Sequence, residues 1–131
     1  MRFGTGNAGG ICTWRRNYNR HYRLRLNRLS IYLVSEIEVT NPAAYGAEFA
    51  PQAQAAIKAA GGRLIAIGGI AGAGAKPLKA ITGTPPKRVA IQQWDSFDHL
   101  NAWFNSEEYQ QTLKIGENYA TFRRYAVEGT Q

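Results

Sequence analysis

The sequence predicts an α+β domain in which a four-stranded antiparallel sheet carries its helices on one face. Residues 31–39 alternate apolar with more polar side chains, as a half-buried strand does. Residues 89–94 form a short β-rich run between turn residues, and apolar side chains at helical spacing follow it. With the elements between and after them, the order is βαββαβ, with an extra short helix before the last strand. That order is typical of the ferredoxin-like arrangement.

In the first strand, one face carries four large apolar side chains and is expected to lie against the core. Its residues are Ile31, Leu33, Ile37 and Val39. The opposite face carries Tyr32 and Val34 beside Glu36 and Glu38. A face with this much apolar surface is expected to be partly covered.

A helix is predicted after Asn41, which can cap it, with Pro42 at its first position. Apolar side chains recur along one face of this helix, at Tyr45, Phe49, Ala53, Ala56, Ile57 and Ala60. Pro51 lies inside the helix and is expected to kink it, because proline lacks an amide hydrogen and clashes one turn back. The pair Gly61-Gly62 is expected to end the helix.

The second predicted strand, Arg63 to Ile70, runs into a glycine-rich stretch at residues 68–76. This stretch resembles a phosphate-binding loop, but Lys76 stands one position too late for that motif. Pro77 also prevents a helix that would aim its amides at a phosphate. We therefore expect a flexible hairpin connection here, leading to a third strand at Val89 to Trp94.

Two capped helices are predicted after the third strand. Ser96 can cap the first helix, whose apolar face is Phe97, Leu100, Trp103 and Phe104. Ser106 can cap the second helix, with Glu107 and Glu108 in its first turn. Thr121 to Glu128 is expected to form the last strand.

The positive charge of the chain is concentrated at its N-terminus. Of the 131 residues, the first 30 hold seven arginines and no acidic residue, and residues 31–131 hold nine basic and nine acidic side chains. No nucleic-acid or membrane partner is therefore expected for residues 31–129. Residues 1–30 are expected to be a disordered or accessory extension. An accidental extension from a start placed too far upstream, an organelle transit peptide, and an arm that binds RNA or anionic lipid remain alternatives for them.

Seven short segments in a fixed order resemble a known family. They are Asn41-Pro42-Ala43-Ala44-Tyr45, Gly61-Gly62-Arg63, Pro86-Lys87-Arg88-Val89, Asp95-Ser96-Phe97, Ala102-Trp103 with Asn105-Ser106, Tyr109, and Val127-Glu128-Gly129. Together they are similar to the small bacterial family called domain of unknown function 1330, in the dimeric α/β-barrel superfamily. The resemblance covers about residues 31 to 129. It implies a homodimer whose two sheets form one barrel, with a pocket between each sheet and its helices.

The resemblance also directs attention to side chains that could bind a ligand in that pocket. They are Arg88, Tyr109, Tyr45, Ser106, Arg63, Trp103 and Gln93. Arg88 could clamp a carboxylate with its planar fork or form an ion pair at the end of a strand. Tyr109 could direct its hydroxyl into the pocket or be a core aromatic, and Ser106 is foremost a helix cap. Gln93 stands where some members of the family have a glutamate, which weakens an acid–base role.

Metal and thiol chemistry are not expected. His99 is predicted on the exposed side of its helix, with no second ligand at a suitable spacing. Cys12 is the single cysteine, so an internal disulfide is excluded and a reducing, cytoplasmic setting fits. No cofactor is expected either. A membrane-spanning run of 18 apolar residues is absent from the sequence.

These observations support a homodimer that binds a small organic molecule, anionic or aromatic, between its sheet and its helices. Whether it is a cofactor-free enzyme stays open, and no catalytic residue is predicted. The alternative is a non-catalytic, stress-linked binding or interaction module. The second faces of the strands, with Tyr32, Val34, Ala90 and Trp94, are expected to meet the second copy.

Overall fold

The computed structural model describes residues 29–71 and 75–130 of the chain. Most of the arginine-rich N-terminal stretch and the centre of the glycine-rich connection lie outside these residues. Residues Ser30–Gly129 form one compact unit.

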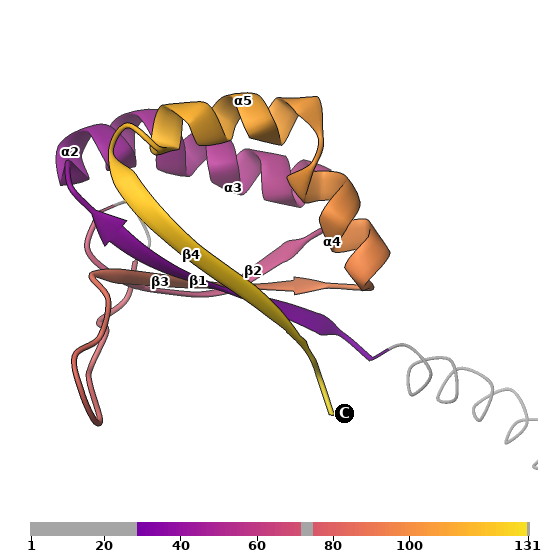
Figure 1. Cartoon of the computed structure of the whole chain (residues 1–131), viewed down its shortest axis with the longest axis horizontal. Helices are drawn as coiled ribbons and strands as arrows, with labels where there is room; N and C mark the ends of the chain where they lie inside the picture. The colour runs from indigo at the N-terminus through magenta and orange to yellow at the C-terminus, as the bar shows by residue number, and fades with distance from the viewer. Residues whose placement is uncertain (1–28, 72–74, 131) are drawn as a thin grey trace, which may run out of the picture. The chain divides into compact units, whose positions relative to one another are not determined.

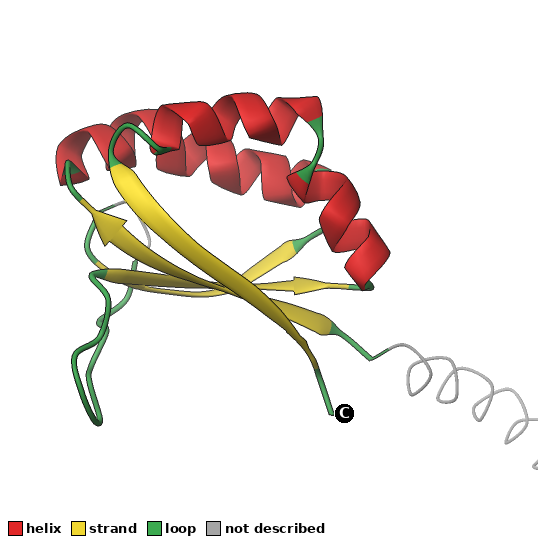
Figure 2. Cartoon of the chain, viewed as in Figure 1, coloured by secondary structure: helices red, strands yellow, loops and turns green. Residues whose placement is uncertain are grey.

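The elements follow the predicted order, and Figure 1 shows them along the chain. They are β1 (Ile31–Val39), α2 (Pro42–Ala44), a π-helical turn (Tyr45–Phe49), α3 (Ala50–Ala59), β2 (Arg63–Gly69), β3 (Arg88–Trp94), α4 (Phe97–Phe104), α5 (Glu107–Gly116) and β4 (Ala120–Glu128). The four strands form one sheet in the order β2-β3-β1-β4, with every neighbouring pair antiparallel. Helices α3 and α5 lie side by side over one face of the sheet (Figure 2). The predicted α+β, ferredoxin-like fold is confirmed.

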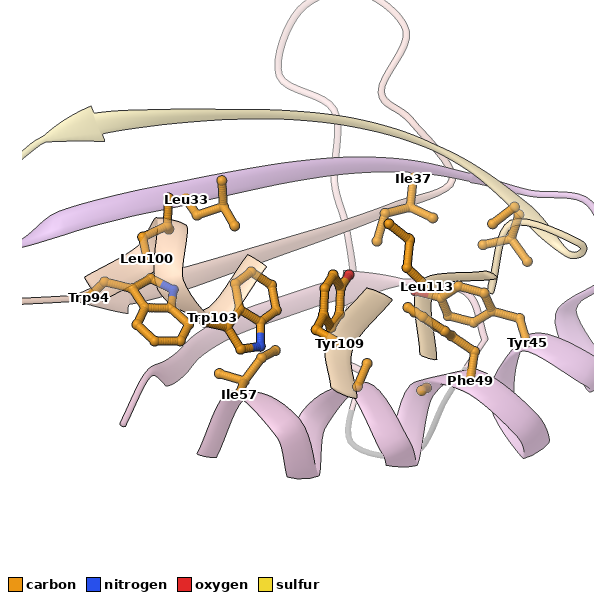
Figure 3. Packing of buried hydrophobic residues seen from close by; sticks show 14 of the residues in the cluster. Leu33, Ile37, Tyr45, Phe49, Ile57, Trp94, Leu100, Trp103, Tyr109 and Leu113 are labelled. Carbon is orange, nitrogen blue, oxygen red and sulfur yellow. The ribbon is translucent and has the colours of Figure 1, made fainter. Parts of the chain in front are cut away.

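The core lies between that sheet face and the helices. In β1 the buried side chains alternate with half-buried or exposed ones, as predicted. Figure 3 shows Leu33 and Ile37 on the strands facing Ile57 and Phe49 on the helical layer. Ser35 lies on the same buried face of β1, in phase with the apolar residues.

The faces predicted for the side chains of β3 are wrong, because Ala90 and Trp94 were expected on the face away from the helices. Trp94 is 1 % exposed and faces the helices, and Ala90 lies opposite Ser35 on the same buried face. The open face instead carries Val89 and Ile91. The run from residue 89 to 94 has apolar side chains in both phases, so only its register against β1 decides which set is buried.

The long helix is irregular ahead of Pro51 rather than at it. The amide of Ala50 donates to the carbonyl of Tyr45, five residues back, which is a π-helical bond. Pro51 then falls in the first turn of α3, where a missing amide hydrogen costs little. The wide turn buries both Tyr45 and Phe49 against the sheet.

All three predicted helix caps are present. The Asn41 side chain accepts a hydrogen bond from the amide of Ala44 at 3.2 Å, and Ser96 accepts one from His99 at 3.0 Å. Ser106 accepts the amide of Tyr109 at 3.3 Å. Each cap satisfies an amide that the helix itself leaves without a partner.

Two residues of α4 lie differently from their prediction. Phe97 is 46 % exposed, and His99 is half-buried instead of facing solvent. His99 Nε2 donates to the carbonyl of Ala60 at 2.6 Å, and its ring meets the edge of Trp94 at 5.2 Å. Ala60 ends α3, so this hydrogen bond joins α4 to the C-terminal end of α3.

The close approach of Gly62 to Trp94 predicts the effect of a single methyl group. A Cβ at position 62 would lie 2.4 Å from the Trp94 ring, so Gly62→Ala should lower the free energy of unfolding by about 1–3 kcal/mol. Gly68→Ala is the control, because its Cβ would come no nearer than 3.4 Å to another residue. Thermal unfolding should show a lower Tm for Gly62→Ala, by roughly 4–8 °C per kcal/mol, and an unchanged or raised Tm for Gly68→Ala. Equal melting temperatures for the two variants would contradict this packing.

Candidate functional site

A cavity of about 40 Å³ lies between the buried face of the sheet and the helices. Its polar side chains include two cations, Arg88 and Arg124, and two phenols, Tyr45 and Tyr109. Ser35 and Gln92 also contribute to the lining, while no aspartate, glutamate or histidine among the described residues does so. The cavity is therefore rich in hydrogen-bond donors and positive charge.

Arg88 enters this cavity from the start of β3 and is only 3 % exposed. Its Nη1 donates to the backbone carbonyls of Ile70, at 3.1 Å, and Ala71. Its guanidinium carbon lies 5.3 Å from the centre of the Tyr45 ring. The strand-end ion pair considered from the sequence is not found among the described side chains, and Nε of Arg88 has no partner among them. Arg88 is thus a buried cation that keeps a free donor.

Arg124 is the site residue that sequence reasoning missed. It lies opposite Ser35 on the buried face of the sheet, and its guanidinium carbon lies 4.3 Å from the centre of the Phe122 ring. Its Nη2 donates to the hydroxyl oxygen of Tyr109 at 2.6 Å. The signal was available, because Arg124 is in phase with the apolar Phe122 and Ala126 along β4.

Tyr109 is held in place by two of the other predicted site residues. The Trp103 ring packs on the Tyr109 ring, with the two centroids 4.2 Å apart. Ser106 caps α5, and its hydroxyl accepts the backbone amide of Tyr109. Figure 3 shows the Tyr109 hydroxyl directed toward the strands. Trp103 and Ser106 do not line the cavity themselves. Their place in the structure is behind Tyr109, where they position it.

Both phenols keep their protons near neutral pH. Burial raises the pKa of the Tyr109 hydroxyl, and the positive charge of Arg124 only partly opposes that effect. Burial likewise raises the pKa of the Tyr45 hydroxyl, against the charge of Arg88. The two hydroxyls can therefore donate hydrogen bonds but are poor proton acceptors.

Arg63 and Gln93 lie away from the cavity. They are paired on the open face of the sheet, where Gln93 Nε2 donates to Ser30 Oγ at 2.7 Å. The neighbouring Gln92 takes the place expected of Gln93: it is buried, lines the cavity and accepts a hydrogen bond from Trp94 Nε1 at 2.9 Å. A difference of one residue in a strand moves a side chain to the opposite face.

In residues 29–71 and 75–130, no group of three or more histidine, cysteine, aspartate or glutamate side chains is placed to hold a metal ion. None of the helices in those ranges is long and apolar enough to cross a bilayer.

Comparison with protein families and known structures agrees with this architecture. A family model described as domain of unknown function (DUF1330) matches residues 30–130, as the sequence resemblance predicted. No curated protein matches the chain.

Three solved structures share the fold. A Rhodopseudomonas palustris protein of unknown function is 12% identical, with 88% of this chain and 93% of that chain covered and a TM-score of 0.61. SnoaB, a cofactor-independent oxygenase from Streptomyces nogalater, is 15% identical over 79% of this chain and 95% of its own, with a TM-score of 0.57. A conserved Bacteroides thetaiotaomicron protein of unknown function, described as a "possible oxidoreductase", is 17% identical, with 78% of this chain and 99% of that chain covered and a TM-score of 0.53. Identities this low show a shared fold and nothing further.

The buried phenols predict how stability depends on alkaline pH. The pKa values of Tyr45 and Tyr109 are higher in the folded state than in the unfolded state. The two phenols therefore make their full contribution to the free energy of unfolding below about pH 10, and this contribution is lost as the pH rises through their pKa values in the folded state. Chemical unfolding at a series of pH values should show stability falling above about pH 10. Tyr109→Phe should make that fall shallower, since one of the two groups is gone. An equally steep fall in the variant would show that Tyr109 is not a buried, protonated phenol.

Proposed function

This chain belongs to the DUF1330 family, and we propose that it binds a small organic anion in the cavity between its sheet and its helices. The observation that carries the proposal is the pair of arginines, Arg88 and Arg124, that meet at one cavity lined by no described acidic side chain. A cation removed from water is costly unless a charge or hydrogen-bond acceptor compensates it. An anion in the cavity would supply both.

Arg88 supports this role more specifically. Its Nη1 is occupied by two backbone carbonyls, which fix the plane of the guanidinium. Its Nε is buried with no acceptor among the described residues. Guanidinium groups bind carboxylates through two parallel hydrogen bonds, and a guanidinium held in a fixed plane at the cavity suits that geometry. We therefore favour a carboxylate as the anionic group.

The lining favours binding over proton-transfer chemistry. A general base near neutral pH is usually a histidine or carboxylate, and no described residue of the lining is either. The two phenols hold their protons more tightly than usual, which makes them donors. Two proteins of the same fold are a cofactor-independent oxygenase and a possible oxidoreductase. A cofactor-free reaction is therefore a second candidate function for this chain. Such a reaction would use the same hydrogen-bond donors to stabilise negative charge.

The partner that we propose for the open sheet face is a second copy of the chain. Tyr125 is 49 % exposed there and Val127 is 56 % exposed, and Val34 lies between Ile91 and Tyr125 at the middle of that face. Contiguous apolar surface of this kind is unusual on a sheet facing water. The face also holds an ion pair, Arg123 with Glu36 at 2.5 Å, that a self-complementary contact could enclose.

Two adjacent arginines provide a matched test of the binding site. Arg124 lines the cavity, whereas Arg123 points to the open face. In an NMR titration with sodium propionate at constant ionic strength, Arg124→Gln should weaken binding by about 10- to 150-fold, the value of a charge-assisted hydrogen bond. Arg123→Gln should leave the affinity nearly unchanged.

If both substitutions weaken propionate equally, the attraction is a general effect of charge and the site is wrong. Arg124→Lys guards against a merely structural loss, because it keeps the charge and the packing of the stem. Its affinity should fall between those of the wild type and Arg124→Gln. Thermal unfolding of each variant establishes that the protein compared is folded.

The association of two copies is tested at the centre of the open face. Light scattering at micromolar concentration should give twice the chain mass of 14.5 kDa. Val34→Arg should give the mass of one chain, because it would bury an unpaired charge in the contact. Ala59→Arg, on the exposed side of α3, should keep the doubled mass. A single-chain mass for the wild type would refute the proposed partner.

A further inference from the structure

The hydroxyl group of Tyr109 accepts a hydrogen bond at the cavity but donates none within the described residues. A phenol has one hydrogen to donate and lone pairs that accept. Arg124 Nη2 already donates to the oxygen of Tyr109 at 2.6 Å. Within the described part of the chain, no acceptor takes the hydroxyl hydrogen in return. Tyr109 thus presents a donor that a neighbouring cation polarises.

The donor has a well-defined position. The Tyr109 ring packs against two aromatic rings of α4, with centroid separations of 4.2 Å to Trp103 and 5.7 Å to Phe104. Its backbone amide is fixed by Ser106 at 3.3 Å. Burial keeps the phenol protonated, as its raised pKa indicates. A rigid donor of this kind loses little conformational entropy when a ligand arrives.

Charge and hydrogen bonding are divided between two places in the cavity. Arg88 comes from β3 and brings its positive charge to the lining, whereas Tyr109 comes from α5 and keeps its hydroxyl hydrogen. A plain carboxylic acid whose two oxygens both face Arg88 leaves the Tyr109 hydroxyl without an acceptor. A molecule with a carboxylate and a nearby carbonyl oxygen satisfies both. The cavity volume of about 40 Å³ restricts the match to short chains.

We propose that the ligands of this cavity are short oxo acids, whose carboxylate is held by Arg88 and whose carbonyl oxygen accepts a hydrogen bond from the Tyr109 hydroxyl. This assignment rests on the proposed anion-binding function and narrows it to one chemical class. Arg124 donates from its Nη2 to a lone pair of the phenol, which directs the hydroxyl hydrogen toward the ligand, and its charge and remaining donors help Arg88 to hold the carboxylate. Hydrophobic substituents on the ligand would meet the aromatic and aliphatic part of the lining.

The test compares acids that differ only in the oxo group. Pyruvate is paired with propionate, and 2-oxobutyrate with butyrate, in NMR titrations of the full chain at constant ionic strength. The wild type should bind each oxo acid about 2- to 12-fold more tightly than its partner, the value of one neutral hydrogen bond. Tyr109→Phe should remove that preference and still bind propionate. Tyr32→Phe, on the open face, should keep it.

Each outcome decides a different claim. If no acid binds, the anion-binding function itself fails. If all four acids bind without preference, or if Tyr109→Phe keeps the preference, anion binding stands and the oxo-acid assignment is wrong; a water on Tyr109 would then be the simplest account. Should Tyr109→Phe not fold, the carbonyl carbon of [2-13C]pyruvate decides: its resonance must move to higher frequency on binding to the wild type, and an unmoved resonance overturns the assignment.

Discussion

The register of β1 against its two neighbours is the constraint on which the site depends. In an antiparallel sheet, side chains at paired positions share a face, so one register places whole sets of residues. Ser35 lies between Ala90 of β3 and Arg124 of β4. Two positions further along β1, Ile37 lies opposite Arg88. The pairing that buries the apolar face of β1 therefore also brings two arginines into the core layer.

Those arginines are accommodated by different means. Arg88 is bonded to backbone carbonyls of the connection that follows β2, and it lies over the Tyr45 ring. Arg124 is surrounded by aromatic rings and donates to Tyr109. Aromatic faces and carbonyls stabilise a guanidinium without neutralising it. The positive charge of the cavity is therefore retained, and the proposed function in anion binding rests on this property.

The helices position the aromatic side chains of the site. Tyr45 and Phe49 lie four residues apart in the π-helical turn, and both are buried beside the cavity, while Pro51 follows in the first turn of α3. The Ser106 cap starts α5 so that Tyr109 lies in its first turn, against Trp103. Ser106 and Trp103, two of the candidate ligand-binding residues, lie behind Tyr109 and orient it. Family resemblance marks such residues without distinguishing the two roles.

The sequence by itself determined the class of the fold, the order of its elements and its three helix caps, because local periodicity and capping chemistry depend on neighbours along the chain. It also marked Arg88, Tyr45 and Tyr109. Tertiary structure alone decided which face of β3 is buried, so that Gln92 rather than Gln93 lines the cavity, and that Arg124 enters it. Both depend on strand register, which is set by pairing between segments far apart in the sequence. The alternation within either strand alone is ambiguous and does not show which face is buried.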